Sequence, residues 1–277
     1  MNWLITGVSS GLGLALAEAA LARGDTVVGV VRRAESRVEF EALAPGRSIG
    51  VLADMADEAA VEKAVQAAEA ATGGLDVLVN NAGYGLVGAI EESSVAEVRA
   101  QFEVNVYGPI AMIRAVLPFM RARRRGHIVN VTSVSGYNAW CGIGVYSASK
   151  FALEAIGECL AQEVGPLGIK VSNIAPGGLR TDYAGRSLTR TADRIEDYDA
   201  TAHESFRILT AGAGKERGDP ARVAEVILQV TGMEAPPLHL LLGPDAIHYA
   251  TRRMGALQSE MGDWISLSTS TFFPPGD

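Results

Sequence analysis

The 277-residue sequence lacks the features that would place it in a membrane, in a secretory pathway or on nucleic acid. Its two cysteines, Cys141 and Cys159, are too few for a disulfide framework and lack the spacing of a metal site. No segment approaches the roughly 18–20 uncharged apolar residues of a membrane span, and no basic stretch followed by an apolar one marks a signal peptide. Acidic residues outnumber basic ones by 32 to 24, and the net charge of −8 argues against nucleic acid. We therefore expect a cytoplasmic protein with no membrane, nucleic-acid or metal partner.

Short apolar stretches alternate with helical patterns along most of the chain. Expected strands cover residues 3–6, 26–31, 48–52, 75–80, 127–132, 169–174 and 238–242. Expected helices cover residues 12–23, 57–71, 94–124, 147–164 and 219–231. Such alternation predicts parallel strands joined by right-handed crossovers. We expect one α/β domain over residues 1–277, built on a doubly wound, Rossmann-type parallel sheet of about seven strands with helices on both faces.

Two segments interrupt this alternation. Residues 183–217 are polar, rich in Arg, Asp and Thr, and only weakly helical. A long insertion between the last two strands of such a sheet is more often an active-site lid than a linker. Residues 244–277 form a C-terminal tail that contains Trp264, Phe272 and Phe273. We expect this tail to pack back on the body or on a neighbouring subunit.

A glycine-rich turn separates the first expected strand from the first expected helix. Its glycines have the spacing G-x-x-x-G-x-G over residues 7–13. Glycine lets a backbone approach a pyrophosphate closely, and a helix N-terminus supplies N–H donors and the positive end of a dipole. The order of strand, turn and helix therefore predicts a dinucleotide phosphate site at Gly7, Ser9, Ser10, Gly11, Leu12 and Gly13.

Tyr146 and Lys150 stand four residues apart where a helix is expected. Side chains at this spacing lie on one helical face, so the phenol and the ammonium can address the same point. A free tyrosine has a pKa near ~10, and a nearby cation favours its phenolate form. A tyrosine activated in this way can donate and accept protons near neutral pH. Such a pair alone is common on protein surfaces. Here it indicates a catalytic site because other motifs accompany it in the sequence.

With four further motifs, the sequence resembles a short-chain dehydrogenase/reductase from Thr6 to Leu242. The glycine turn after Thr6 matches the cofactor turn of that family. The other matching motifs, in the family's order, are Asn80-Asn81-Ala82-Gly83, Asn105, Ser133, Tyr146 with Lys150, and Pro176-Gly177 followed by Thr181. Each motif is weak singly, but together and in order they are specific.

The resemblance implies roles for individual residues. Tyr146 would be the general acid and base at a carbonyl oxygen, and Ser133 would hydrogen-bond that oxygen. Lys150 would lower the pKa of Tyr146 and hold the nicotinamide ribose, while Asn105 would hold a water. Cofactor contacts are implied for Asp54, Met55, Asn81, Ala82, Gly83, Tyr146, Lys150, Pro176, Gly177 and Thr181.

The end of the second expected strand predicts the cofactor. NAD-binding folds place an acidic residue there for the ribose 2′-hydroxyl. Here Val31 stands at that position, and Arg32 and Arg33 follow it. Arginine can pair with a 2′-phosphate bidentately, whereas a carboxylate would repel it. We therefore expect NADP(H) to be preferred over NAD(H).

The substrate expected from the resemblance is a mid-sized, partly apolar ketone or aldehyde, interconverted with its alcohol. The residues that suggest this border the expected pocket; they are Tyr84, Leu86, Tyr137, Trp140, Cys141 and Ile143. Two alternatives stay open. One is an epimerase or dehydratase that uses the same fold, and the other is a non-catalytic regulator that senses NADP(H).

The resemblance also implies an assembly through the helices expected at 94–124 and 147–164. More apolar positions occur on the second helix than one buried stripe needs, namely Phe151, Ala155, Ile156, Cys159 and Leu160. We expect a homodimer, with a tetramer as the alternative.

Overall fold

The computed structural model describes residues 1–182 and 187–273. Its main sheet has seven strands in the order β3-β2-β1-β4-β6-β7-β9, and all neighbouring strands are parallel. The strands are β1 (Asn2–Thr6), β2 (Thr26–Val31), β3 (Ser48–Leu52), β4 (Val77–Asn80), β6 (Gly126–Val131), β7 (Ile169–Pro176) and β9 (His239–Leu242). The predicted doubly wound sheet is confirmed, and its strand order reverses between β1 and β4, where such folds bind ligands.

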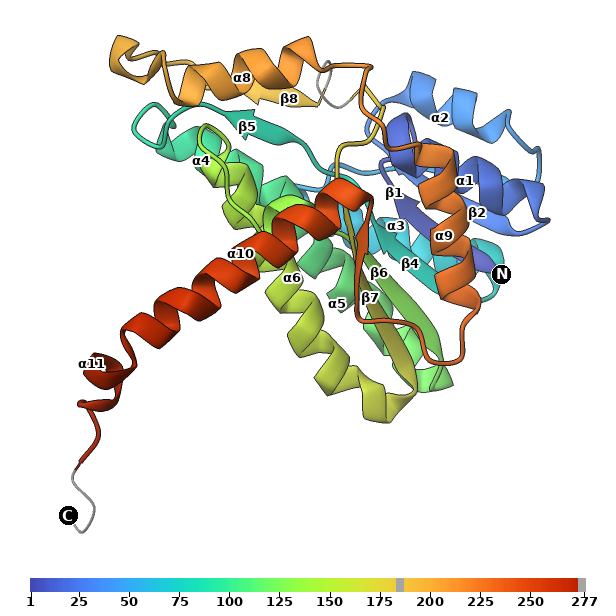
Figure 1. The fold of residues 1–277 in the computed structure, drawn as a ribbon. Coiled ribbons are helices and arrows are strands. Elements are labelled where there is room, and N and C mark those ends of the chain that lie inside the picture. The colour runs from blue at the N-terminus through green and yellow to red at the C-terminus, as the bar shows by residue number, and fades with distance from the viewer. Residues whose placement is uncertain (183–186, 274–277) are drawn as a thin grey trace.

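Helices cover both faces of this sheet (Figure 1). The described helices are α1 (Gly11–Ala22), α2 (Ala34–Glu41), α3 (Glu58–Thr72), α4 (Val95–Phe102), α5 (Gly108–Arg123), α6 (Gly144–Val164), α8 (Ala202–Ala211), α9 (Pro220–Gly232), α10 (Pro244–Asp263) and α11 (Ile265–Thr269). Strand side chains alternate between two apolar cores, as the period of two requires. Leu4 and Val28 belong to the core beneath α3, α5 and α6. Trp3, Ile5 and Val27 belong to the core beneath α1, α2 and α9.

Three helices differ from the expected ones. The sequence does not predict α2, because only Ser36 and Phe40 of this helix are buried and its apolar stripe is weak. The predicted helix 94–124 divides into α4, a π-helical turn at Glu103–Tyr107, and α5. The predicted helix 147–164 begins earlier, at Gly144, so Tyr146 lies inside the first turn of α6.

The insertion after β7 has its own secondary structure. Residues 183–186 of the predicted lid lie outside the described residues, and residues 187–217 contain β8 (Leu188–Arg190) and α8. β8 pairs in parallel with β5 (Gly85–Val87), which follows β4, and the two form a small separate sheet. The sequence does not predict this pairing, because three-residue strands carry little periodicity.

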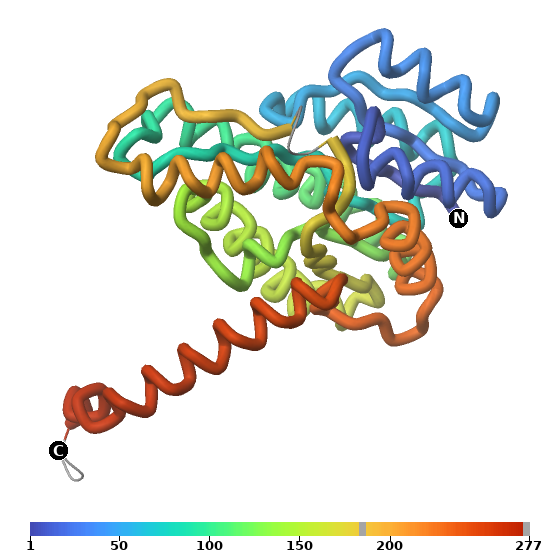
Figure 2. Tube along the Cα trace, turned by 45° about the horizontal axis from the view of Figure 1, so that its top comes forward, coloured from blue at the N-terminus to red at the C-terminus, as the bar shows by residue number. Residues whose placement is uncertain are grey.

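The C-terminal tail leaves the body as a long helix (Figures 1 and 2). Ala246 and Ala250, in the first turns of α10, are fully buried, and the Tyr249 ring meets Trp140 edge-on at 5.4 Å. All residues from 251 to 273 are exposed, so packing of the tail on its own body ends at residue 250. Residues 274–277 lie outside the described part. Within that part, no helix combines the length and the apolar character needed to cross a bilayer.

Candidate active site

The glycine turn forms a cradle at the carboxyl end of β1. Gly7 and Gly11 have φ angles of +74° and +59°, which side chains rarely tolerate. A Cβ added at Gly13 would lie 2.4 Å from the Gly7 carbonyl oxygen, so only glycine fits there. The side chain of Ser10, the N-cap of α1, makes no capping hydrogen bond. The turn and the start of α1 therefore suit a pyrophosphate, as the sequence predicts.

The Asn81-Ala82 segment after β4 braces this turn. The Asn81 Nδ2 donates to the Thr6 carbonyl at 2.8 Å, and the Ala82 N–H donates to the Thr6 Oγ1 at 2.9 Å. A Cβ added at Gly7 would lie 3.1 Å from the Ala82 Cα. The side chain of Asn81, expected to contact the cofactor, thus holds the turn that would carry the phosphates.

The segment after β7 closes the cradle from the other side. The Gly177 N–H donates to the Leu242 carbonyl at 2.9 Å, which extends the pairing of β7 with β9. A Cβ added at Gly11 would lie 3.5 Å from the Thr181 Cβ. The structure therefore brings Thr181 to the glycine turn, as expected, and places Pro176 and Gly177 at the same edge of the sheet.

Two arginines stand at the rim beyond β2. Arg32 and Arg33 are exposed, and Arg33 Nη2 lies 3.4 Å from the Ser36 Oγ at the start of α2. Burial raises the pKa of Tyr84, and the charge of Arg32 acts in the opposite direction. Both arginines follow β2 directly, where the sequence predicts an anionic group of the cofactor.

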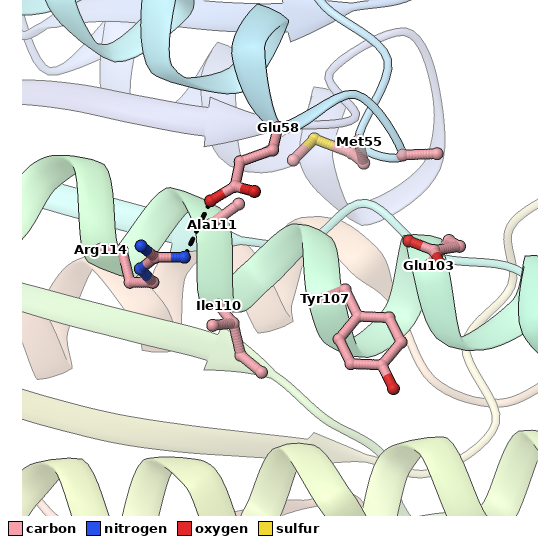
Figure 3. A pocket seen from close by; sticks show the side chains of 8 residues that line it. Met55, Glu58, Glu103, Tyr107, Ile110, Ala111 and Arg114 are labelled. Atoms are coloured by element: carbon pink, nitrogen blue, oxygen red, sulfur yellow. Dashed lines mark hydrogen bonds and ion pairs between the residues drawn. The ribbon is translucent and has the colours of Figure 1, made fainter.

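Asp54 and Met55 follow β3, and their side chains lie in different surroundings. Asp54 is exposed and accepts a hydrogen bond from the Ala56 N–H at 3.0 Å. Met55 is buried and lines a hollow of about 410 Å³ on the outer side of α5 (Figure 3). The other residues lining it are Ala56, Glu58, Glu103, Tyr107, Ile110, Ala111 and Arg114. No predicted catalytic residue lines this hollow, so it is not the candidate substrate site.

Lys150 projects from α6 to the end of β6. Its Nζ donates to the Val131 carbonyl at 2.9 Å and lies 5.8 Å from the centre of the Tyr146 ring. Both side chains are buried, at 6% and 9% exposure. Burial lowers the pKa of Lys150 to about 8, and the charge of Glu154 acts in the opposite direction. The structure thus brings the predicted phenol and ammonium together.

Asn105 lies in the π-helical turn between α4 and α5, a kind of irregularity that often occurs at functional sites. Its Oδ1 accepts from the Tyr84 N–H at 3.1 Å, and its Nδ2 lies within hydrogen-bond distance of the Tyr84 carbonyl (2.9 Å) and the Ser149 Oγ (3.1 Å). A Cβ added at Gly83 would lie 3.1 Å from the Asn105 Oδ1 and 3.7 Å from the Lys150 Nζ. The side chains of Asn105 and Lys150 therefore both lie close to Gly83.

Ser133 lies two residues after β6 and is the N-cap of a 3-10 turn. Its Oγ accepts from the Ser135 N–H at 3.1 Å, which leaves the hydroxyl hydrogen able to donate elsewhere. Ser133, Asn105, Tyr146 and Lys150 all lie on elements at the carboxyl end of β6 or packed against it. All four predicted catalytic residues thus belong to one edge of the sheet.

A polar cluster that the sequence does not predict lies beneath this edge around the buried Glu154, and we call it the Glu154 cluster: Thr132, Tyr137, Glu154, Asn173 and His239. Glu154 accepts from the Thr132 hydroxyl, from the Tyr137 hydroxyl at 3.0 Å and from the Asn173 Nδ2 at 2.9 Å. The His239 Nδ1 lies 3.1 Å from the same carboxylate. Tyr137, expected to border the pocket, therefore turns its hydroxyl into the interior. The signal for the cluster is the position of the acid, one helical turn after the predicted lysine.

A second buried acid, Glu92, fastens the lid. It is 1% exposed and accepts from the backbone N–H of Ile195 at 2.7 Å and of Ala89 at 2.8 Å. His203 of α8 contacts it at 2.6 Å through Nε2 and contacts Asp199 through Nδ1. Burial favours the neutral acid, but the two N–H donors and His203 outweigh it and hold the pKa of Glu92 below its usual value. Residues 187–217 of the predicted lid are therefore held by the segment after β5.

The family model for short chain dehydrogenase matches residues 2–191. Over 270 residues the chain is 38% identical to "Oxidoreductase BOA17" of Botryotinia fuckeliana, covering 97% of this chain and 98% of that protein. It is 34% identical to a 3-ketodihydrosphingosine reductase of Bacteroides thetaiotaomicron (87% of each chain) and 37% identical to retinol dehydrogenase 8 of Bos taurus (85% of this chain and 79% of that one).

Solved structures agree with these relatives. A short-chain dehydrogenase of Streptomyces avermitilis superposes with a TM-score of 0.91 at 39% identity, covering 98% of both chains. One of Burkholderia phymatum in complex with NAD gives 0.83 at 26% identity, covering 93% of this chain and 94% of that one. A serine dehydrogenase complexed with NADP+ gives 0.76 at 25% identity, covering 88% and 95%. Both nicotinamide cofactors thus occur among proteins of similar structure.

Proposed function

The chain belongs to the short-chain dehydrogenase family, and we propose that it is an NADP(H)-dependent oxidoreductase interconverting a ketone or aldehyde and its alcohol. The observation that carries this proposal is the approach of Lys150 to both Tyr146 and Asn105 at the edge where the glycine cradle lies. A buried ammonium beside a phenol favours the phenolate, and the cradle supplies the site for a dinucleotide.

The chemistry follows from the positions of the side chains. When bound, the nicotinamide would supply or accept the hydride at the carbonyl carbon. Tyr146 would give its proton to the carbonyl oxygen, and the Ser133 hydroxyl would donate to the same oxygen as charge develops there. Lys150 would lower the pKa of Tyr146 and bind the nicotinamide ribose. Asn105 would hold the water that reconnects Lys150 to solvent.

We propose NADP(H) over NAD(H) because Arg32 and Arg33 stand beyond β2 and Val31 replaces an acid there. Both arginines are exposed at the rim, within reach of a ribose 2′-phosphate held beside β2. Cofactor contacts at Asp54, Ala82, Gly83, Pro176, Gly177 and Thr181 belong to the same proposal.

For the substrate we propose a carbonyl compound with a long apolar portion. Two relatives are named for 3-ketodihydrosphingosine and for retinol, both of which carry such a chain. Leu86 is buried on β5, which pairs with β8 of the proposed lid, and Ile90, after β5, and Ile208, on α8 of the lid, are exposed. Apolar side chains of this kind suit a hydrocarbon chain.

We also propose an assembly and a cellular location. Phe151, Ala155 and Cys159 are exposed on α6 and Phe119 on α5, as a homodimer through these helices would require, with a tetramer as the alternative. The tail from residue 251 onward is a further surface that a neighbouring subunit could cover. A cytoplasmic location is supported by Cys141 and Cys159, which are both free.

The test is to mix the protein with NADPH and a series of ketones and aldehydes of increasing chain length, and to follow the absorbance of the reduced cofactor. We expect oxidation of NADPH with a kcat/KM that rises with chain length. NADPH that binds without oxidation by any carbonyl would favour the regulator, and a change of substrate without net cofactor turnover would favour the epimerase or dehydratase. The same assay repeated with NADH measures the cofactor preference.

A further inference from the structure

Glu154 lies one helical turn beyond Lys150 on α6. Positions four apart share one side of a helix, and here both side chains bind the end of β6. The Lys150 Nζ donates to the Val131 carbonyl at 2.9 Å, while Glu154 accepts from the hydroxyl of Thr132, the next residue. Since Ser133 follows directly, the two side chains hold the strand end from which Ser133 projects.

Burying the Glu154 carboxylate costs free energy, which neighbouring groups must offset. Its side chain is 7% exposed, close to the 6% of Lys150. A carboxylate removed from water is stable only where hydrogen-bond donors and a positive charge replace its hydration. The Glu154 cluster provides the donors, from the Tyr137 hydroxyl and the Asn173 amide among others. Lys150 provides a buried positive charge one turn away on the same helix face, and the charge of Glu154 raises the pKa of Lys150 against the effect of burial.

The other groups packed against Glu154 are less suited to balance its charge. β6 and β7 contribute Thr132 and Asn173, which are neutral. Burial, with the charges of Glu154 and Glu158, raises the pKa of Tyr137, which therefore remains a neutral donor. His239, on β9, is 36% exposed at its side chain, so water screens its charge when it is protonated. Lys150 is the buried cation among the described neighbours.

We propose that Glu154 is a positioning residue of the active site: it is the buried counter-charge of Lys150 and it fixes the strand end that carries Ser133. It acts through Lys150 and Thr132. The inference rests on the proposed function, because it deepens the role that Lys150 has there. Glu154 itself does not contact the substrate or the cofactor in the proposed mechanism.

The experiment measures the titration of Lys150 directly. The sequence contains four lysines, so protein labelled with carbon-13 at the lysine ε carbon gives a spectrum in which Lys150 is identified by its loss in Lys150→Met. In the wild type we expect a midpoint near the pKa of about 8. In Glu154→Gln, which keeps the size and an acceptor oxygen but loses the charge, the midpoint should fall by about one pH unit or more.

Glu158→Gln is the matched control, since Glu158 is exposed one turn further along α6. It should leave the Lys150 midpoint within about 0.3 units of the wild type, as a screened surface charge does. An unchanged Lys150 midpoint in folded Glu154→Gln would overturn the proposal, whatever happened to its Tm. The alkaline limit of NADPH binding should move down with the midpoint. If the wild type binds no NADPH, the proposed function fails, while the lysine titration still decides the role of Glu154.

If Glu154→Gln does not fold, it is combined with Lys150→Met. Lys150→Met alone leaves the buried Glu154 carboxylate without its cation, whereas the double variant carries neither buried charge. The double variant should therefore fold, with a Tm at or above that of Lys150→Met. A double variant less stable than Lys150→Met would count against Glu154 as the counter-charge of Lys150.

Discussion

Two buried carboxylates, Glu154 and Glu92, hold two parts of this molecule in different ways. Glu154 joins α6 to β7 and β9 and to the residue that follows β6, through Asn173, His239 and Thr132. The partners of Glu92 belong to the lid and to the loop after β5. Removing Glu154 therefore disturbs the central sheet, whereas removing Glu92 releases a peripheral segment. The edge that carries the predicted catalytic residues is built into the core, and the predicted lid is fastened at the periphery.

The remaining contacts of the lid support this comparison. The Tyr198 hydroxyl donates to Glu91 at 2.6 Å, and the Ala192 N–H donates to Glu97 at 2.9 Å. Glu91, like Glu92, lies between β5 and α4, and Glu97 lies in the first turn of α4. Because these contacts and the short β5–β8 pairing are peripheral, we expect residues 187–217 to be able to open as a unit while the main sheet stays intact.

The largest effect is expected from Tyr146→Phe, which removes only the oxygen that transfers the proton. Turnover should fall by about 10²–10⁴-fold, the usual worth of a positioned acid or base. NADPH affinity and Tm should stay close to the wild type, because the ring and its packing remain. Tyr107→Phe, at a phenol 54% exposed on the outer side of α5, is the control and should keep full activity. A Tyr146→Phe enzyme with more than about a tenth of the wild-type rate would show that another group is the acid.

Glu154→Ala should cause the largest loss of stability. It leaves the Thr132, Tyr137 and Asn173 donors and the Lys150 charge without their partner, and breaking such a buried arrangement costs about 3–5 kcal/mol. Urea unfolding measures the loss, with Glu158→Ala as the exposed control on the same helix. A loss below about 1 kcal/mol, typical of a surface substitution, would remove the contrast between the two carboxylates.

The sequence predicts the catalytic edge far better than the lid. The strands and the glycine turn have local signals, and the ends of parallel strands necessarily meet at one edge. Glu154 has a signal too, four residues after Lys150, but its partners Asn173 and His239 lie on other strands. The contacts of Glu92 with Ile195 and His203 span more than 100 residues and depend on a three-residue strand pairing. Contacts between residues so far apart leave no periodic pattern in the sequence.

At the cofactor rim, Arg32→Asp should move the cofactor preference toward NADH. Loss of one charge-assisted hydrogen bond, worth about 1.5–3 kcal/mol, corresponds to roughly tenfold to a hundredfold in the ratio of kcat/KM values. Arg37→Asp is the control, because Arg37 lies on α2 and pairs with Glu41 at 2.9 Å. Equal use of both cofactors by the wild type would contradict the assignment of Arg32.

The smallest effect is expected when the pH is lowered far enough to protonate Glu92. The folded-state pKa of Glu92 lies below its usual value, so its stabilisation of the lid is complete above the ordinary glutamate pKa of about 4.3 and is lost as the pH falls through the lower folded value. Pepsin cleavage within residues 187–217 should therefore accelerate, by a few-fold, only at a pH below about 4.

Glu92→Gln should show this faster cleavage already at pH 5, because the charge that holds the His203 ring and the Ile195 N–H is gone. Glu91→Gln is the matched control, since Glu91 is exposed beside it and binds the lid only through the Tyr198 hydroxyl. If the two variants were cut at the same rate at pH 5, the lid would be held by β5–β8 pairing and not by the buried acid. If instead Glu92→Gln lowered the Tm as much as Glu154→Ala, the lid would be part of the core, and the distinction between the two regions would fail.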